Sequence, residues 1–109
     1  MDNASVMEML DGVGYIDPDH PEYIEASKIA ELPLPFLEFE FEAVDFFADG
    51  IVYMSWQRLE IRLYTDTQLR SETEHKLERK LRQAEISANK KRDFLPELGL
   101  WQTTYTMEV

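Results

Sequence analysis

The sequence predicts a single α+β domain, in which a small, mostly antiparallel sheet of about four strands carries its helices on one face. Two observations predict this fold class. Stretches at 36–42, 51–64 and 100–109 alternate apolar and polar residues, which is the period of a half-buried strand. A stretch that begins at Ser71 instead repeats its apolar residues every three or four positions, as an amphipathic helix does. The length of 109 residues and the apolar share of 44% are sufficient for one packed core.

Residues 1–32 are predicted to form a variable, helical N-terminal segment that precedes a core at 33–109. Asn3 is placed to cap a short helix, whose apolar residues recur at helical spacing before two glycines end it. Asp19 and Pro21 are typical of the first turn of a second short helix, which would reach about residue 31. The prolines of LPLP then favour extended geometry, and the core begins there.

The first predicted strand is the segment FLEFEFE, whose apolar residues point to one face and whose glutamates point to the other. The two sets are Leu37, Phe39 and Phe41, and Glu38, Glu40 and Glu42. Asp49 and Gly50 supply a turn that leads into the long strand at 51–64, because glycine adopts a positive φ at low cost.

The long strand changes parity halfway along its length. Its first apolar residues are even-numbered and its later ones are odd-numbered, namely Val52, Met54 and Trp56, then Leu59, Ile61 and Leu63. A strand that buries one face keeps one parity, so we expect a bulge near 57–58 that moves the apolar side chains from one face to the other. Bulges of this kind also occur in monomers, where they wrap a sheet round a helix.

The main helix is predicted to begin at Ser71, since Ser71 and Glu74 have the spacing of a capping box. Its narrow buried stripe consists of Thr73, Leu77, Leu81 and Ala84. A short fourth strand is expected around 94–95, and the last strand places alternate residues of 101–109 on one side.

The charge of the chain is strongly acidic and unevenly distributed. The net charge is −11, but residues 1–57 contain 13 acids and one base while residues 58–109 contain 9 acids and 10 bases. Direct binding of nucleic acid is not expected, because phosphate contacts need a basic face. No segment has the length of an apolar membrane span or the pattern of a signal peptide, and cysteine is absent, so we expect a protein made in a cytoplasm.

No arrangement of residues in the sequence predicts a reaction. His20 and His75 are far apart, the segment DPDHPE lacks the oxygen spacing of a calcium loop, and four glycines form no phosphate loop. We therefore expect no catalytic activity, no cofactor and no bound metal.

The run LPFLEFEFEAVDFFADGIVYMSWQRLEIRLYTDT, followed by a helix and a strand TTYTMEV, resembles a family of bacteriophage proteins. The family comprises the tail-terminator, or tail-completion, proteins of phages and prophages with long non-contractile tails, which are also labelled minor capsid proteins. The resemblance covers 33–109 and rests on the segments ADG…Y at 48–53 and LEIRLYTD at 59–66. The segment before residue 33 is longer than the family pattern, and NKKRDFLPELGL departs from it.

The resemblance implies a structural protein of the virion that assembles at the head–tail junction. Subunits of the family form a six-fold ring on the end of the tail tube, stop tube polymerisation and provide the surface that joins the head. The implied partners are copies of the same chain, the major tail tube protein and the head–tail connector protein. We expect weak association of isolated subunits and a stable ring on the tube end.

The interface residues that we expect are of two kinds. Val52, Met54 and Trp56 would supply apolar area, and Lys90, Lys91 and Arg92 would face the acidic half of the next subunit. Two other functions stay open: a head–tail connector-completion protein, and a small acidic inhibitor or nucleic-acid mimic encoded by a mobile element. The acidic inhibitor would be monomeric or dimeric and would bind a host DNA-binding protein.

Overall fold

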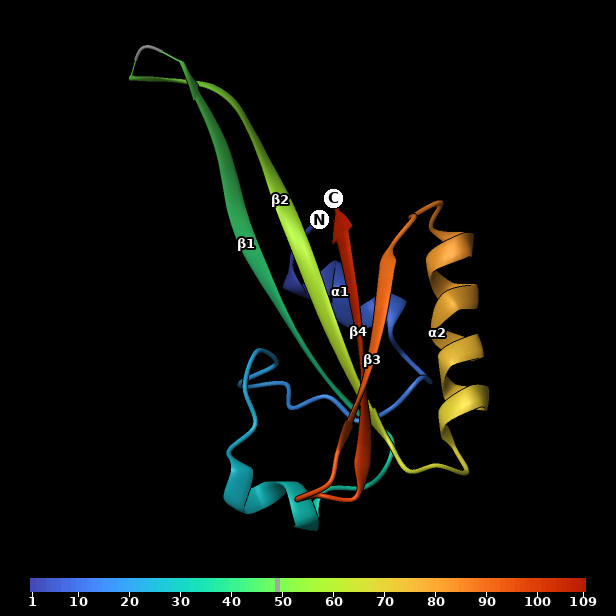
Figure 1. Cartoon of the computed structure of the whole chain (residues 1–109). Coiled ribbons are helices and arrows are strands. Elements are labelled where there is room, and N and C mark those ends of the chain that lie inside the picture. The colour runs from blue at the N-terminus through green and yellow to red at the C-terminus, as the bar shows by residue number, and fades with distance from the viewer. Residues whose placement is uncertain (49) are drawn as a thin grey trace.

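The computed structural model describes residues 1–48 and 50–109, without the side chains of 26, 27, 30, 45–48 and 51–55. In chain order the elements are α1 (Asn3–Met9), the 3-10 helix η1 (Ala26–Glu31), β1 (Phe36–Ala48), β2 (Ile51–Thr65), α2 (Arg70–Gln83), β3 (Asn89–Leu95) and β4 (Leu100–Glu108). Figure 1 shows that β1 and β2 are much longer than the two strands beside them.

The four strands form one antiparallel sheet in the order β1-β2-β4-β3, which confirms the predicted α+β fold. One row across the sheet pairs Phe39 with Ile61, Ile61 with Tyr105, and Tyr105 with Lys90. Side chains of one row share a face, because successive residues of a strand alternate between faces. We call the face that carries the side chains of this row the helix-covered face. The residues that alternate with them lie on the opposite face, which we call the polar face.

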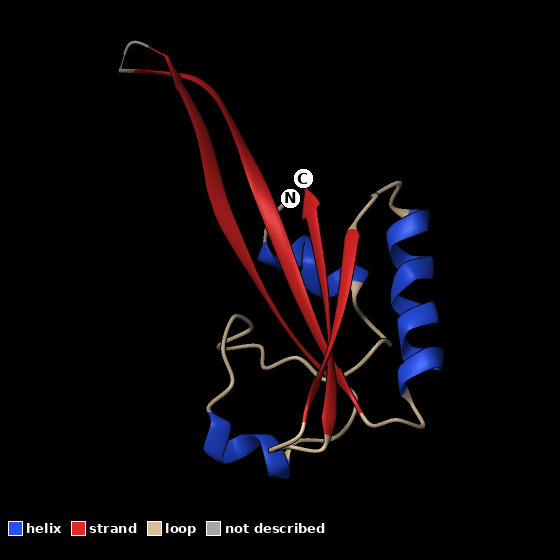
Figure 2. Cartoon of the chain, viewed as in Figure 1, coloured by secondary structure: helices blue, strands red, loops and turns tan. Residues whose placement is uncertain are grey.

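The main core lies between the helix-covered face and the two α-helices (Figure 2). Val6 and Leu10 from the first helical segment and Leu77 from α2 are completely buried. The strands contribute Leu37, Phe39, Leu59, Ile61, Leu63, Tyr105 and Met107. The predicted stripe of the main helix is confirmed at its first three positions, whereas Ala84 is exposed because α2 ends at Gln83.

A second, smaller cluster covers the lower end of the polar face. The rings of Phe36 and Tyr64 stack with centroids 4.6 Å apart, and Leu100 is buried beside them. The N-terminal segment covers this cluster with Ile24 and Ile29. The rest of the polar face carries no helix.

The start of α2 differs from the prediction of a cap at Ser71. The residue before the helix is Leu69, which has helical backbone angles and no side-chain cap hydrogen bond. Asp66 Oδ1 instead accepts a hydrogen bond from Leu69 N at 2.7 Å, and Thr73 Oγ1 donates to the Leu69 carbonyl. The capping box was wrong because Glu74, its expected second member, turns towards cations of β3.

The N-terminal segment also differs from the prediction. Asp2, rather than Asn3, caps α1 by accepting a hydrogen bond from Ser5 N at 2.8 Å. The second predicted helix is reduced to η1, because residues before it bond to β1. Phe39 N donates to the Pro21 carbonyl at 2.8 Å, for example.

The bulge predicted near 57–58 was also wrong. Pairing is continuous there, with Arg58 opposite Glu42 and Gln57 opposite Ala43, and the register shifts instead between Phe46 and Phe47. The change of parity needs no bulge at that point. The lower half of β2 packs on helices, and the upper half lies beyond them.

Candidate functional site

The upper part of β1 and β2 forms an arm that extends past the rest of the sheet (Figure 1). The last pair between β2 and β4 joins Arg58 to Glu108, and Val109 N donates one further hydrogen bond to the Gln57 carbonyl at 3.0 Å. Above Gln57, β1 and β2 pair only with each other in the described chain. We define the arm as 43–57. Its sequence is mainly apolar, AVDFFADGIVYMSW followed by Gln57. A two-stranded ribbon cannot bury such residues by itself, so the arm is a candidate interaction surface.

The three apolar interface candidates all belong to this arm. Val52 and Met54 pair through their backbones with Phe47 and Phe46, but their side chains lie outside the described part of the structure. Trp56 pairs with Val44 on the polar face and is half-buried. Its indole Nε1 is shielded from solvent and has no hydrogen-bond partner among the described residues.

An ion network on the polar face fixes the N-terminal segment to the sheet. Glu38 is 6% exposed and accepts hydrogen bonds from Arg62 Nε at 3.1 Å, from Tyr64 Oη at 2.7 Å and from Ile24 N at 2.8 Å. Arg62 also donates to the Glu22 carbonyl at 2.9 Å and to two further carboxylates, Glu40 and Glu60. The network closes the lower edge of β1, so its role is structural.

The phenol of Tyr64 is part of the same network. Burial and the hydrogen bond to Glu38 raise the pKa of Tyr64 to about 12. The hydroxyl therefore remains protonated and donates to the carboxylate. Gln102 Nε2 donates to the same oxygen at 2.8 Å, which satisfies its acceptor capacity.

The basic interface candidates belong to β3, and two of them bind a buried carboxylate of the same chain. Glu74 is 2% exposed and accepts two hydrogen bonds from Arg92 Nε and Nη2, of 2.9 and 2.8 Å, and one from Thr103 Oγ1 of 2.7 Å. Lys90 Nζ lies 3.0 Å from Glu74 and 3.1 Å from Glu78. We call this arrangement the Glu74 cluster.

The environment of Glu74 favours its ionised form. Burial by itself would raise the pKa of Glu74, but the hydrogen bonds from Arg92, Thr103 and Lys90 outweigh it and lower the pKa to about 2. Tyr105 lies next to the cluster, and burial together with the charges of Glu78 and Glu74 raises its pKa. The cluster thus joins α2 to β3 and β4.

Lys91 differs from its two neighbours. It is opposite Thr104, which places it on the polar face, and its side chain is 77% exposed. Asp93 is its ion-pair partner, at 3.8 Å. Of the three predicted basic residues, Lys91 is the most exposed and the one that does not bind Glu74.

Glu38 and Glu74 were not identified from the sequence as structural residues. Glu74 precedes Leu77 by three positions and Leu81 by seven, a spacing that places it on the buried side of the helix. Glu38 had no comparable signal, since it alternates with phenylalanines like the exposed Glu40 and Glu42.

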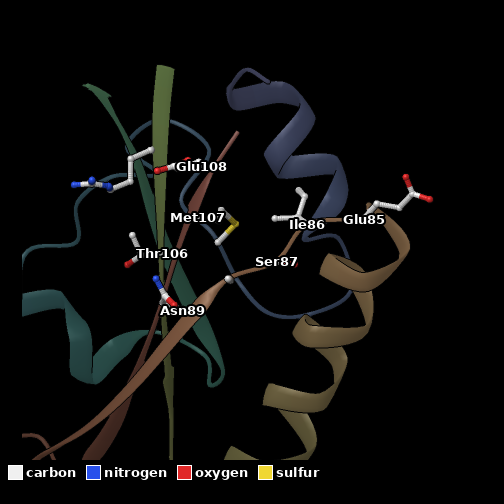
Figure 3. A pocket seen from close by; sticks show the side chains of 9 residues that line it. Glu85, Ile86, Ser87, Asn89, Thr106, Met107 and Glu108 are labelled. Carbon is white, nitrogen blue, oxygen red and sulfur yellow. The ribbon is translucent and has the colours of Figure 1, made fainter. Parts of the chain in front are cut away.

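A hollow of about 640 Å³ lies below the arm, where β3 begins and β4 ends. Figure 3 shows the end of β4 on one side of it and the segment between α2 and β3 on the other. Its lining mixes charged residues such as Arg58, Glu85 and Glu108 with the apolar Ile86 and Met107. The lining contains no histidine or cysteine, so this set of residues does not indicate a catalytic group.

The two histidines are both exposed and lie on separate elements. His20 Nδ1 is 3.9 Å from Glu22 in the N-terminal segment, and His75 lies on the outer side of α2. Within the described residues, no group of three or more histidines or carboxylates is arranged to hold a metal ion.

No helix of the described chain has the length and apolar character needed to cross a membrane. Comparison of the chain with family models, with curated proteins and with solved structures finds no match.

Proposed function

We propose that this chain is a structural subunit of a phage tail, which assembles into a ring on the end of the tail tube and terminates tube polymerisation. In this function it would also provide the surface that joins the tail to the head, and it would have no catalytic activity. The proposal combines the resemblance of 33–109 to tail-terminator proteins with the shape of the molecule.

The arm is the observation that carries the proposal. Above the pair Arg58–Glu108, two strands with a largely apolar sequence continue without a covering helix or third strand in the described chain. A monomer gains no core from such an element, whereas a subunit of an assembly can use it to contact a neighbour or the tube. The body below the arm has its own core.

The proposal is tested by removing the gene from the phage or prophage that encodes it. Induced cells should then contain tube assemblies of uncontrolled length and heads without tails, as seen by negative-stain electron microscopy. Supplying the wild-type chain from a plasmid should restore tails of uniform length that are joined to heads. Tails of normal length in the absence of the chain would contradict the proposal.

The same micrographs separate the terminator from a connector-completion protein. If the chain completes the connector, its loss leaves tails of normal length that fail to join heads. Labelled protein would then be found on heads and not on the ends of free tails.

A further inference from the structure

We propose that copies of this chain associate head to tail by strand pairing, with the free part of the β1 edge of one copy against the β3 edge of the next. This inference deepens the proposed function, since it rests on a ring of identical subunits and names the surfaces that would form it. It concerns two edges of one sheet, which the structure describes in full for β3 and through residue 48 for β1.

Both edges of the sheet have main-chain groups available for pairing. The N-terminal segment closes β1 only at its lower end, where Leu37 N and Phe39 N donate to the carbonyls of Tyr15 and Pro21. Above Phe39, over 40–48, the outer side of β1 has no main-chain partner in the described part of the chain. The outer side of β3, a strand of seven residues, is likewise unpaired there. Exposed edges of this kind accept further strands.

The strand directions suit a closed ring. Each neighbouring pair in the order β1-β2-β4-β3 is antiparallel, so β1 and β3 run in opposite directions. Within one sheet β3 lies in the rows of β1 residues up to Glu40, so a rotation about an axis inclined to the strands is needed; it brings β3 of one copy antiparallel to β1 of the next and shifts it along β1 to the free part. Contacts between two different surfaces close into a ring when the rotation allows it.

The charges of the two edges favour this pairing over a symmetric one. The free part of β1 begins with Glu40 and Glu42, both exposed on the polar face, and β3 presents Lys91 on that same face. Two copies joined through β1 alone would place glutamates opposite glutamates, which disfavours association. Opposite charges across the pair select the head-to-tail arrangement instead.

Engineered cysteines test the arrangement directly, because the natural chain contains no cysteine. Glu42 and Lys91 are 69% and 77% exposed, so Glu42→Cys and Lys91→Cys leave the core unchanged. At a protein concentration of several hundred micromolar, oxidation of the double variant should yield a ladder of oligomers or a closed ring. Each single variant should yield no species above a dimer. A short bis-maleimide can replace oxidation. It also links cysteines that are near each other without being directly opposite, so the result does not depend on the exact register of the two strands.

The matched control places the second cysteine away from the edge, as Glu42→Cys with Lys76→Cys on the outer side of α2, where the lysine is 49% exposed. This pair should not form a ladder. If the Glu42/Lys91 double variant gives only dimers, or if the control gives the same ladder, head-to-tail edge pairing is wrong.

A charge exchange provides the second measurement. In sedimentation equilibrium at low salt, Glu42→Lys or Lys91→Glu alone should weaken self-association by about fivefold, and the double exchange should restore it. Failure of the double exchange to restore association would contradict the pairing. If the double variant forms a ladder but removal of the gene leaves tail length unchanged, the proposed function is wrong and the edge pairing stands. If the chain controls tail length but no ladder forms, only the edge pairing is wrong.

Discussion

Glu74 is the residue whose environment has the clearest consequence for stability. It is buried between α2 and the sheet, and its carboxylate is held by Arg92, Lys90 and Thr103. A buried carboxylate costs free energy unless it is paired, so the cluster makes the cations of β3 part of the fold. Lys90 and Arg92, which were predicted to face the next subunit, therefore bind a carboxylate of their own chain.

The Glu74 cluster predicts how stability depends on pH. The pKa of Glu74 is about 2 in the folded chain against 4.5 for a free carboxyl, so ionised Glu74 stabilises the fold above pH 4.5. This stabilisation, about 3 kcal/mol from the shift in pKa, is lost as the pH falls from about 5 to about 2. Glu74→Gln should therefore lower the free energy of unfolding by about 2–3 kcal/mol at pH 7 and have little effect near pH 2.

Urea unfolding followed by circular dichroism at several pH values measures this difference. Glu72→Gln is the matched control, because Glu72 lies on the same helix, is 70% exposed and should change stability by less than about 0.5 kcal/mol. An equal loss from Glu74→Gln at pH 7 and pH 2 would show that packing, and not the charge, is responsible.

The basic residues of β3 give a second prediction at this scale. Arg92→Glu removes a cation that binds the buried carboxylate of Glu74 and places a second carboxylate beside it, so it should lower the melting temperature. Lys91→Glu changes an exposed residue of the polar face and should alter stability by less than about 0.5 kcal/mol. Melting temperatures of the two variants check this contrast. Equal melting temperatures would indicate that the Glu74 cluster contributes little.

Among the elements, α2 supports the core through few side chains. Leu77 and Leu81 are 0% and 4% exposed and pack against the strands, so truncation of either to Ala should cost about 2–5 kcal/mol. Arg79→Ala on the outer side of the same helix is the control and should have little effect. Chemical denaturation measures both. A cost below about 0.5 kcal/mol at both leucines would show that α2 is not part of the core.

The elements also show which features of the fold can be predicted from sequence. Alternation identified β1, β2 and β4, and helical periodicity identified α2, because both patterns arise from burial of one face. The cap at Ser71 and the helix from 19 to 31 were wrong, because residues distant in sequence compete for the same groups. Glu74 binds β3, and the Pro21 carbonyl binds β1. Such competition depends on tertiary structure and leaves no local pattern.

The candidate site could be predicted only in part, for a related reason. The parity change in the long strand predicted a bulge near 57–58, because a shift of one residue turns the apolar side chains to the other face. The continuous pairing of Gln57 and Arg58 with Ala43 and Glu42 contradicts that position. The base of the arm lies where β4 stops pairing with β2, at Arg58 and Glu108. The sequence contains no clear signal for the position at which this pairing ends.

At the scale of the whole molecule, the body and the arm have separate roles. Among the side chains that the structure describes, the buried core lies in the body, below the pair Arg58–Glu108, and the arm continues from it through paired backbone. Charge is divided as well, since residues 1–57 hold most of the acidic excess. An acidic surface and an apolar projection on a stable body are suited to assembly with other proteins.

Shortening the arm tests this division of roles. Replacing 46–54 with Asn-Gly joins Asp45 to Ser55, which already face each other in the register, through a two-residue turn. The body should keep its melting temperature within a few degrees, because the core residues that the structure describes, such as Leu59, Ile61 and Met107, all lie outside the deleted segment. In cells that lack the natural gene, the shortened chain should fail to restore tails of uniform length, although it is folded and present at the normal level. A control that keeps the length of the arm, Asp49→Asn, should restore them, since it changes one residue of the sequence between β1 and β2 and leaves both strands at full length. Uniform tails joined to heads with the shortened chain would show that the arm is not the assembly surface.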